Sequence, residues 1–308
     1  MVKICYLIIA HNNPKHLRRL VRSLASDSSA FFIHIDRKSR LDDFSNVHGQ
    51  NVHFSRARIA SYWGDFSLVE AILGLLRMAL ADQRHFNYFS LLSGTDYPLQ
   101  PVSYIESFLE RNRGTEFMNI VRMPSEDAGK PMSRLDTYKP SPRGPRISSI
   151  VRKLRTTTGG NSVDRDYTRH FPHLVPYGGS AWWTLSREAC EHIQTFVDDE
   201  CQFMQFFRHT HIPEEVFFQT ILGNSPYRSS MQRSLTYTDW SGGGPHPADI
   251  TEAHLEFLTA TASIVVDDVY GKGEVLFARK FSDDAEEVVL RLEQLRIEKE
   301  HRHTSRCA

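Results

Sequence analysis

The segment from Ile4 to Ile35 constrains the fold more than any other part of the chain. Ile4–Ala10 is continuously apolar, which predicts a central strand that is covered on both faces. An amphipathic helix is predicted from His16 to Ala25, and Phe31–Ile35 is a second apolar strand. A strand, a crossover helix and a second strand form a βαβ unit, which is right-handed by strong preference. We therefore predict an α/β fold built on an open sheet with parallel strands.

Polar residues follow both of these strands. His11 comes directly after the first strand, and Asp36 comes directly after the second. In open α/β sheets, ligands bind beyond the carboxyl ends of the strands. A carboxylate at such an end can accept hydrogen bonds from a ribose or from a uracil N–H. Asp36 is therefore either a nucleoside-binding acid or a turn residue, and His11 is either its neighbour in a site or a structural loop histidine.

A third apolar strand is predicted at Tyr88–Leu92, and the loop after it has the composition of a ligand-binding loop. This loop contains Gly94, Asp96 and Pro98. Glycine permits a close approach of the backbone, and proline fixes the exit of the chain. Because many strand–turn–helix junctions have the same composition, the loop is a candidate site and no more.

Residues 123–175 form a long, basic segment with weak apolar periodicity. A loop of this length inside a compact domain is usually functional or mobile. Two interpretations stay open, a solvated basic loop, or a lid or acceptor-binding segment that favours anionic or phosphate-bearing ligands. The insertion carries, among other basic residues, Arg134, Lys139, Arg143, Arg146, Arg152, Lys153 and Arg155.

Two adjacent tryptophans, Trp182 and Trp183, lie in a strand predicted after a glycine-rich turn. Adjacent side chains of a strand point to opposite faces. One tryptophan can therefore pack in the core while the other lines a cleft, where an aromatic face can hold a sugar ring. A wholly structural pair is the alternative. Trp63 and Trp240 lie in predicted loops.

The stretch Ile212–Leu222 places two acids, Glu214 and Glu215, directly after a proline and directly before an apolar run. Proline fits the first turn of a helix, and the positive end of the helix dipole favours acids there. The pattern is therefore compatible with an ordinary helix start. The alternative is that one glutamate projects into a cleft as a general base.

Two cations follow the last predicted strand, Val275–Ala278. These cations are Arg279 and Lys280, and they could neutralise a phosphate beside the strand end. The tail from Asp283 to Arg302 is predicted to be a charged helix that packs on the outside of the domain.

Composition argues against several classes of protein. The formal net charge of zero argues against a general nucleic-acid binder. The 4 cysteines have no CxxC spacing, which argues against a zinc site or a disulfide framework and fits a reducing compartment. The first apolar run is too short to span a membrane and lacks a small-residue cleavage site. We expect a single domain over residues 1–308 and a cytoplasmic location, with the inner face of the membrane as an alternative.

Taken in order, several stretches of the chain resemble one family. It is glycosyltransferase family 14, the core-2/I-branching β-1,6-N-acetylglucosaminyltransferase and peptide O-xylosyltransferase group, here as a short, bacterial-type member. The resemblance implies a GT-A-type α/β fold that binds a nucleotide sugar, with a mixed, mostly parallel central sheet flanked by helices. It also implies a UDP-sugar donor and inversion at the anomeric carbon. The matching stretches are Tyr6–Leu24, Phe32–Ser39, Tyr62–Ala71, Tyr88–Pro101, Tyr177–Glu188, Pro213–Thr220, Asp239–Pro247 and Leu276–Phe281.

The resemblance assigns roles to individual residues. The catalytic base of the family falls on Glu215, its uridine-binding acid on Asp36, and the basic residue near the donor phosphates on Lys280. Further candidates on the donor side are His11, Trp63, Asp96 and Arg279. The acceptor-side candidates are Trp182, Trp183, Glu214, Trp240 and Arg134.

The family does without the metal-binding Asp-x-Asp motif of most GT-A enzymes, so we expect no cofactor and no divalent metal. The one such motif here, Asp164-Arg165-Asp166, lies in the basic insertion and not after a buried strand. Cationic side chains are then the available means of stabilising the leaving UDP. The chain lacks the extra arginine that the animal branching enzymes supply upstream of the last lysine motif, because Glu256–Ala262 contains none. Arg279 or an arginine of the insertion could replace it.

These residues together predict an inverting, metal-independent glycosyltransferase that moves a sugar from a UDP-sugar to a hydroxyl, with Glu215 as general base. N-acetylglucosamine and xylose both fit as the donor sugar, and the acceptor is open among glycans, lipid-linked glycans and protein hydroxyls. The alternatives are a catalytically silent nucleotide-sugar or glycan-binding protein and a donor hydrolase. We expect no nucleic-acid partner. Peripheral association with a membrane and the oligomeric state stay open.

Overall fold

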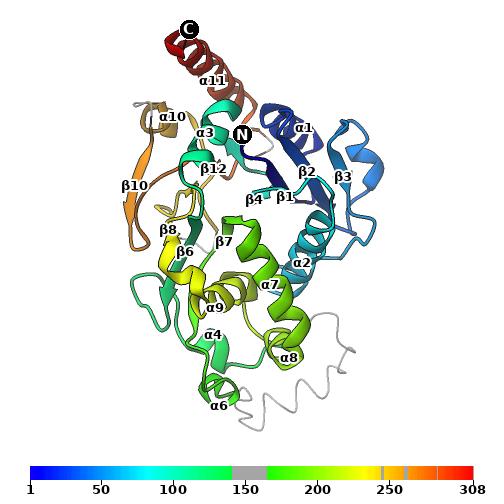
Figure 1. Ribbon diagram of the computed structural model, residues 1–308, viewed down its shortest axis with the longest axis vertical. Helices are drawn as coiled ribbons and strands as arrows, with labels where there is room; N and C mark the ends of the chain where they lie inside the picture. The colour runs from blue at the N-terminus through cyan, green and yellow to red at the C-terminus, as the bar shows by residue number, and fades with distance from the viewer. Residues whose placement is uncertain (141–164, 244–245, 260–262, 283, 308) are drawn as a thin grey trace.

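The computed structural model of the protein describes residues 1–140, 165–243, 246–259, 263–282 and 284–307. Its centre is a seven-stranded sheet with the order β3-β2-β1-β4-β7-β6-β8 (Figure 1). Strands β3, β2, β1 and β4 run parallel, whereas β7 runs antiparallel to both β4 and β6. The predicted α/β class with a mixed, mostly parallel sheet is therefore confirmed. The strands are β1 (Ile4–Ala10), β2 (Ser29–Ile35), β3 (Val52–Phe54), β4 (Tyr88–Ser93), β6 (Glu116–Arg122), β7 (Tyr177–Ser186) and β8 (Met231–Gln232).

Strand β1 shows why a continuously apolar sequence belongs at the centre of the sheet. Cys5 and Leu7 pack into the core under one face, while Tyr6 and Ile8 pack into the core under the other. Because side chains alternate along a strand, both faces of β1 need cover, and only apolar residues suit every position. One face is covered by α2 (Ser67–Leu80), α7 (Arg187–Asp199), α8 (Cys201–Phe207) and α9 (Phe217–Gly223), the other by α1 (Pro14–Ser23) and α3 (Val102–Arg111).

Smaller elements stand beside the main sheet. A three-stranded sheet has the order β5-β12-β9, and β10 pairs with β11 as a separate antiparallel hairpin. The C-terminal helix α11 (Glu286–Cys307) extends further than predicted and projects at one end of the molecule (Figure 1). The strands are β5 (Tyr97–Pro98), β9 (Thr236–Thr238), β10 (Val265–Asp268), β11 (Gly271–Glu274) and β12 (Phe277–Arg279). Further helices of the described residues are η1 (Leu41–Phe44), α4 (Ser133–Asp136), α6 (Tyr167–His170), η3 (Pro226–Ser230) and α10 (Glu252–Thr259).

The predicted helix start at the two acids is wrong in detail. Pro213–Glu215 form a 3₁₀ turn (η2), and the helix α9 begins only at Phe217. Val216 separates them because its φ of −135° lies outside the helical range. The two acids are therefore fixed on a short turn and do not belong to the first turn of a helix.

A bulge interrupts the pairing of β7 with β6. Met118 pairs with Trp183 and Ile120 pairs with Gly179, so the register shifts between these positions. At the bulge the two backbones come close together, and a Cβ added to Gly179 would lie 1.7 Å from the carbonyl oxygen of Asn119. Only glycine fits this position, since any side chain would force the two strands apart.

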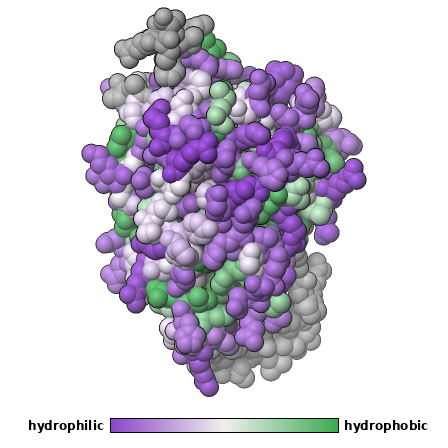
Figure 2. Space-filling view, in the orientation of Figure 1, coloured by the Kyte–Doolittle hydropathy of each residue, from purple (hydrophilic) through white to green (hydrophobic). Residues whose placement is uncertain are grey.

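The surface seen in Figure 2 is largely hydrophilic, with apolar residues in small groups. Across the part of the chain that the structure describes, no helix combines the length and the apolar character needed to cross a membrane.

Candidate active site

A cavity of about 1100 Å³ lies beyond the carboxyl ends of the central strands. His11, which follows β1, and Ser93, which ends β4, both line it. The two strand ends are closely packed, because a Cβ added to Gly94 would lie 2.6 Å from the Cβ of Ala10. The cavity thus lies at the edge of the sheet where the sequence predicted a ligand site.

Glu215 lines the cavity and binds two cations of the basic insertion. Lys130 Nζ lies 2.5 Å and Arg134 Nη1 lies 2.6 Å from the same carboxylate oxygen, Oε2. Burial lowers the pKa of Lys130, while the nearby Glu215 opposes that shift. Arg134, predicted on the acceptor side, therefore reaches the cavity as a partner of the predicted base.

Glu214 also lines the cavity, but its environment differs from that of Glu215. Its side chain is buried, and within the described residues Oε2 has no hydrogen-bond partner. Burial raises the pKa of this carboxyl to about 8, and the adjacent Glu215 contributes in the same direction. At neutral pH Glu214 is therefore mostly an uncharged acid, which can donate a hydrogen bond as well as accept one. Its predicted acceptor-orienting role stays a prediction.

Arg279 is fixed on the cavity wall by a buried acid behind it. Its Nε donates to Asp96 Oδ1 at 3.1 Å, and its guanidinium carbon lies 4.3 Å from the centre of the Trp182 ring. Asp96 is fully buried and also accepts from the backbone N–H of Ser93 at 2.9 Å. Asp96 does not line the cavity, so its predicted place on the donor side is that of a support for Arg279.

Lys280 lines the same cavity and is more loosely held. Its ammonium group lies 3.6 Å from Asp249, and 36% of its side chain is exposed. An exposed lysine at this distance keeps most of its hydration and its freedom to turn. Together with Arg279 it places two cations on one part of the cavity wall, as the sequence predicted for a phosphate.

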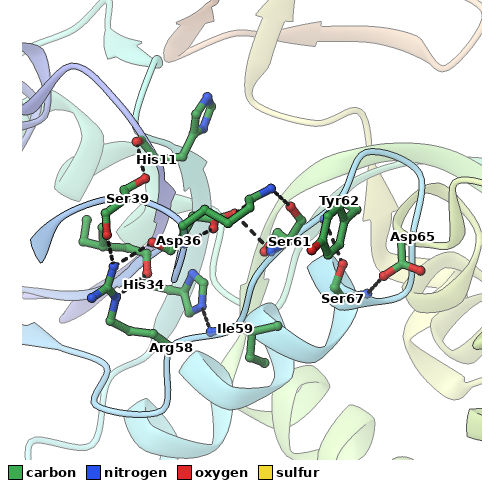
Figure 3. A network of polar contacts seen from close by, with 12 residues as sticks. His11, His34, Asp36, Ser39, Arg58, Ile59, Ser61, Tyr62, Asp65 and Ser67 are labelled. Carbon is green, nitrogen blue, oxygen red and sulfur yellow. Dashed lines mark hydrogen bonds and ion pairs between the residues drawn. The ribbon is translucent and has the colours of Figure 1, made fainter. Parts of the chain in front are cut away.

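Asp36 sits in a dense polar network beside the cavity (Figure 3). Oδ1 accepts from the backbone N–H of Lys38 at 2.8 Å, and Oδ2 accepts from that of Ser61 at 3.0 Å. Arg58 braces the same turn by donating to the Asp36 carbonyl oxygen at 2.7 Å. Asp36 does not line the cavity, so the geometry gives it a structural part in the loop, and its uridine-binding role stays a prediction.

The tryptophans divide as strand geometry requires. Trp182 lines the cavity, whereas Trp183 is 1% exposed and packs against Phe218 in the core. The assignment of Trp183 to the acceptor side is therefore corrected, because its ring is enclosed in the core. Trp63 and Trp240 both line the cavity, and Trp63 makes an edge contact with His246.

Sequence reasoning missed several residues of the cavity wall. Lys130 was not distinguished within the basic insertion, although it is almost buried and contacts Glu215. Tyr270 lies on a hairpin that the sequence did not suggest, and Arg233 pairs with Asp268 beside it. A weak signal was available for the hairpin, since two glycines, Gly271 and Gly273, follow the short run Val265–Asp268.

The basic insertion contributes to the site only in part. Lys139 donates to the carbonyl oxygen of Gly64 at 2.6 Å, next to Trp63. In the Asp-x-Asp motif of the insertion, Arg165 packs on the Phe206 ring at 4.0 Å and Asp166 caps α6, which are structural contacts. Over the described ranges, no group of three or more His, Cys, Asp or Glu side chains is placed to hold a metal ion. Predicted residues that lie outside the described residues are Arg143, Arg146, Arg152, Lys153, Arg155 and Asp164.

A sequence model of the family described as Core-2/I-Branching enzyme matches residues 4–261. The chain belongs to this family. Xylosyltransferase 2 of Mus musculus is 27% identical over 254 residues, which cover 78% of this chain and 27% of that protein. Xylosyltransferase 1 of Rattus norvegicus is 27% identical over 254 residues, which cover 78% of this chain and 28% of that protein. The chain thus spans about a quarter of the length of these relatives.

Among solved structures, mouse xyloside xylosyltransferase 1 in its apo form aligns with 90% of this chain and 97% of that one, at 10% identity and a TM-score of 0.37. Membership of the Core-2/I-Branching family confirms the family predicted from the ordered stretches. The family match ends at residue 261, so it includes Glu214 and Glu215 but not Arg279 and Lys280. The case for those two cations rests on their position in the cavity.

Proposed function

We propose that this protein is a glycosyltransferase that moves a sugar from a UDP-sugar to a hydroxyl of an acceptor, with inversion at the anomeric carbon. Family membership and the xylosyltransferase relatives support the reaction class. The observation that carries the proposal is one cavity lined by a carboxylate, Glu215, and by two strand-end cations, Arg279 and Lys280. Inverting transfer needs a base and a means of stabilising the leaving diphosphate, and this cavity offers both.

In the proposed reaction, Glu215 takes the proton from the acceptor hydroxyl. The two ion pairs occupy Oε2, so Oε1 is the oxygen assigned to the proton. The acceptor oxygen forms a bond to the anomeric carbon while the bond from that carbon to the UDP oxygen breaks on the opposite side. A single in-line displacement of this kind inverts the anomeric configuration. Lys130 and Arg134 hold the carboxylate in place for the attack.

Arg279 and Lys280 are the proposed stabilisers of the leaving UDP. Arg279 is oriented from behind by Asp96 and Trp182, so its charge is preorganised at the cavity wall. We propose that these cations make a divalent metal unnecessary. Treatment with EDTA should leave the transfer rate unchanged, and a loss of activity that manganese restores would contradict this part of the proposal.

The proposal extends to the sugar and the location of the protein. Xylose and N-acetylglucosamine are the two donor sugars proposed, and the xylosyltransferase relatives favour xylose. A cytoplasmic location is supported by Cys5, Cys190 and Cys201, which are unpaired thiols. A thermal-shift screen of UDP-sugars, followed by a product assay with the best binder, identifies the donor.

The decisive test is Glu215→Gln, which keeps the shape of the side chain and removes its basicity. The expected turnover falls by about 10²- to 10⁴-fold, while UDP affinity measured by calorimetry stays within about twofold. Glu287→Gln, an exposed acid on α11, is the matched control and should behave as wild type. Unchanged turnover in Glu215→Gln would remove the residue from the role of base. UDP binding by the wild type without product from any UDP-sugar would favour a silent binding protein.

A further inference from the structure

The turn of the β10–β11 hairpin reaches into the cavity. Asp268 pairs with Gly271 across the hairpin, so the turn itself consists of Val269 and Tyr270. Both residues line the cavity, and Val269 is 43% exposed. Two-residue hairpin turns usually carry Gly, Asn or Asp, because these residues suit the required backbone. The backbone conformation of the turn therefore does not explain why a valine and a tyrosine lie here beside a cavity.

Contacts within the protein fix the conformation of the turn without a ligand. Arg233, whose side chain is 4% exposed, binds Asp268 Oδ2 through Nη2 at 2.7 Å. The backbone N–H of Tyr270 donates to Asp268 Oδ1 at 2.9 Å, which fixes the start of the turn. Gly273 packs on Arg233, since a Cβ added to it would lie 3.2 Å from the Arg233 Cβ. The hairpin therefore presents its two turn residues in a defined position, which reduces the entropy cost of binding.

Tyr270 and Glu215 line the same cavity. Burial raises the pKa of its phenol well above the usual value, and the carboxylate of Glu215 adds to this shift while Arg134 opposes it. Tyr270, Glu215 and Arg134 all line the cavity. The phenol stays neutral at physiological pH, and its hydroxyl remains a hydrogen-bond donor.

We propose that Val269 and Tyr270 form the wall of an acceptor subsite that binds the apolar face of a pyranose ring beside Glu215. A tyrosine suits this task because its ring packs on the C–H face of a sugar while its hydroxyl can bond to a sugar hydroxyl. Trp182 is a second aromatic residue that lines the cavity, and its ring packs against the Arg279 guanidinium. A serine of a peptide presents no ring face, so the subsite fits a saccharide acceptor.

The inference rests on the proposed function only for the role of Glu215, because sugar binding can be measured without transfer. The probes are the methyl β-glycosides of xylose, galactose, glucose and N-acetylglucosamine, titrated by NMR with UDP present. At least one should bind the wild type, and Tyr270→Ala should weaken that binding by about tenfold or more. Tyr270→Phe, which keeps the ring, should retain most of the affinity. Lys272→Ala, an exposed change in the same hairpin and outside the cavity, should match the wild type.

UDP affinity should stay within about twofold in all three variants, because the donor cations lie elsewhere on the wall. The inference is overturned if no glycoside binds, if Tyr270→Ala binds as the wild type does, or if only a serine-containing peptide binds. Equal loss of UDP binding in Tyr270→Ala would assign the residue to the donor and also overturn it. Glycoside binding that depends on Tyr270, in a protein that transfers no sugar from any UDP-sugar, would leave the subsite standing and refute the proposed function.

Discussion

Two pairs of cations face the same cavity, and they differ in where their counter-charges lie. Lys130 and Arg134 bind Glu215, which itself lines the cavity. Arg279 is anchored to Asp96, which is buried behind the wall, and Lys280 is held loosely by Asp249. The first pair therefore uses its charge on a carboxylate that a substrate would meet. Arg279 keeps its positive charge available to a ligand. The acid beside Lys280, Asp249, also lines the cavity, but at 3.6 Å and 46% exposed it neutralises the lysine only weakly.

The comparison shows that the number of cations in a site says little about its affinity for phosphate. What matters is whether the carboxylate that holds a cation stands in front of it or behind it. An acid in the cavity neutralises its partners where the ligand binds, while an acid behind the wall orients its partner without blocking it. By this argument the phosphates belong to Arg279 and Lys280, and Lys130 and Arg134 serve Glu215.

Asp96→Ala is expected to have the largest effect. Removing the buried carboxylate leaves Arg279 without its anchor and should lower the free energy of unfolding by about 3 kcal/mol. UDP affinity should also fall, by about tenfold, because the guanidinium loses its fixed orientation. Chemical denaturation and calorimetry measure the two quantities. Asp249→Ala is the control. Because Asp249 and its partner Lys280 are both partly exposed, this variant should change the free energy of unfolding by less than about 0.5 kcal/mol. Equal effects of the two variants would break the distinction between anchors behind the wall and anchors at the surface.

The stability of the protein should depend on pH through Glu214. Its carboxyl pKa is raised from 4.5 to about 8 in the folded protein, so the native state holds a proton that the unfolded state has lost. Stability from this group is therefore fully present below about pH 4.5 and is lost as the pH rises through about 8. Glu214→Gln removes this dependence and should gain stability relative to the wild type by about 2 kcal/mol or more between pH 6 and pH 9. Thermal unfolding of both proteins across that range is the measurement, and parallel curves would contradict the burial argument.

Lys280→Met and Lys130→Met should separate the two cation pairs. Lys280→Met is expected to weaken UDP binding by about tenfold, or about 1.4 kcal/mol, with little change in stability. Lys130→Met should leave UDP affinity within about twofold but reduce turnover, because Glu215 loses one of its two supports. Calorimetry measures the UDP affinity of both variants, and a steady-state assay measures their turnover. If Lys130→Met weakens UDP more than Lys280→Met, the assignment of phosphates to the strand-end pair is wrong.

The smallest expected effect is that of ionic strength on UDP affinity. Because Lys280 is partly exposed, raising the ionic strength from about 0.05 M to about 0.3 M should weaken UDP binding a few-fold. The ion pairs of Glu215 are more shielded and should keep the base in place over the same range. A turnover number that falls as steeply as UDP affinity would argue against this separation.

Most of the fold could be predicted from the sequence, because central strands of parallel sheets must be apolar at every position. Ile4–Ala10 meets that condition, and Tyr88–Ser93 comes close to it, with the buried Ser90 hydroxyl bonded to Thr184. Both strands are central in the sheet. The position of the cavity also followed, since polar residues after such strands gather at one edge. The exact start of α9 did not follow, because the non-helical backbone of Val216, with a φ of −135°, leaves no mark in the sequence pattern.

The contacts of the site were less accessible to sequence reasoning. Glu215 was singled out, but its two cations come from a segment about 80 residues earlier, where nothing distinguishes Lys130 from its basic neighbours. Trp182 and Trp183 could be assigned to opposite faces, but the choice between the faces depends on the register of β7. Tyr270 was missed because Val269 and Tyr270 are not the Gly, Asn or Asp residues that usually mark a two-residue turn.

The bulge at Gly179 determines which residues of β7 face the cavity. Gly179, Ser180, Ala181 and Trp182 all line the cavity, which an uninterrupted strand could not achieve because alternate residues would turn away. Across the bulge Asn119 alone faces Ser180, Ala181 and Trp182, so deleting one residue from this stretch would shorten the bulge and change which side chains face the cavity. In relatives of this chain, a gap or an insertion at this point would therefore change what the cavity offers to a sugar as much as a substitution does.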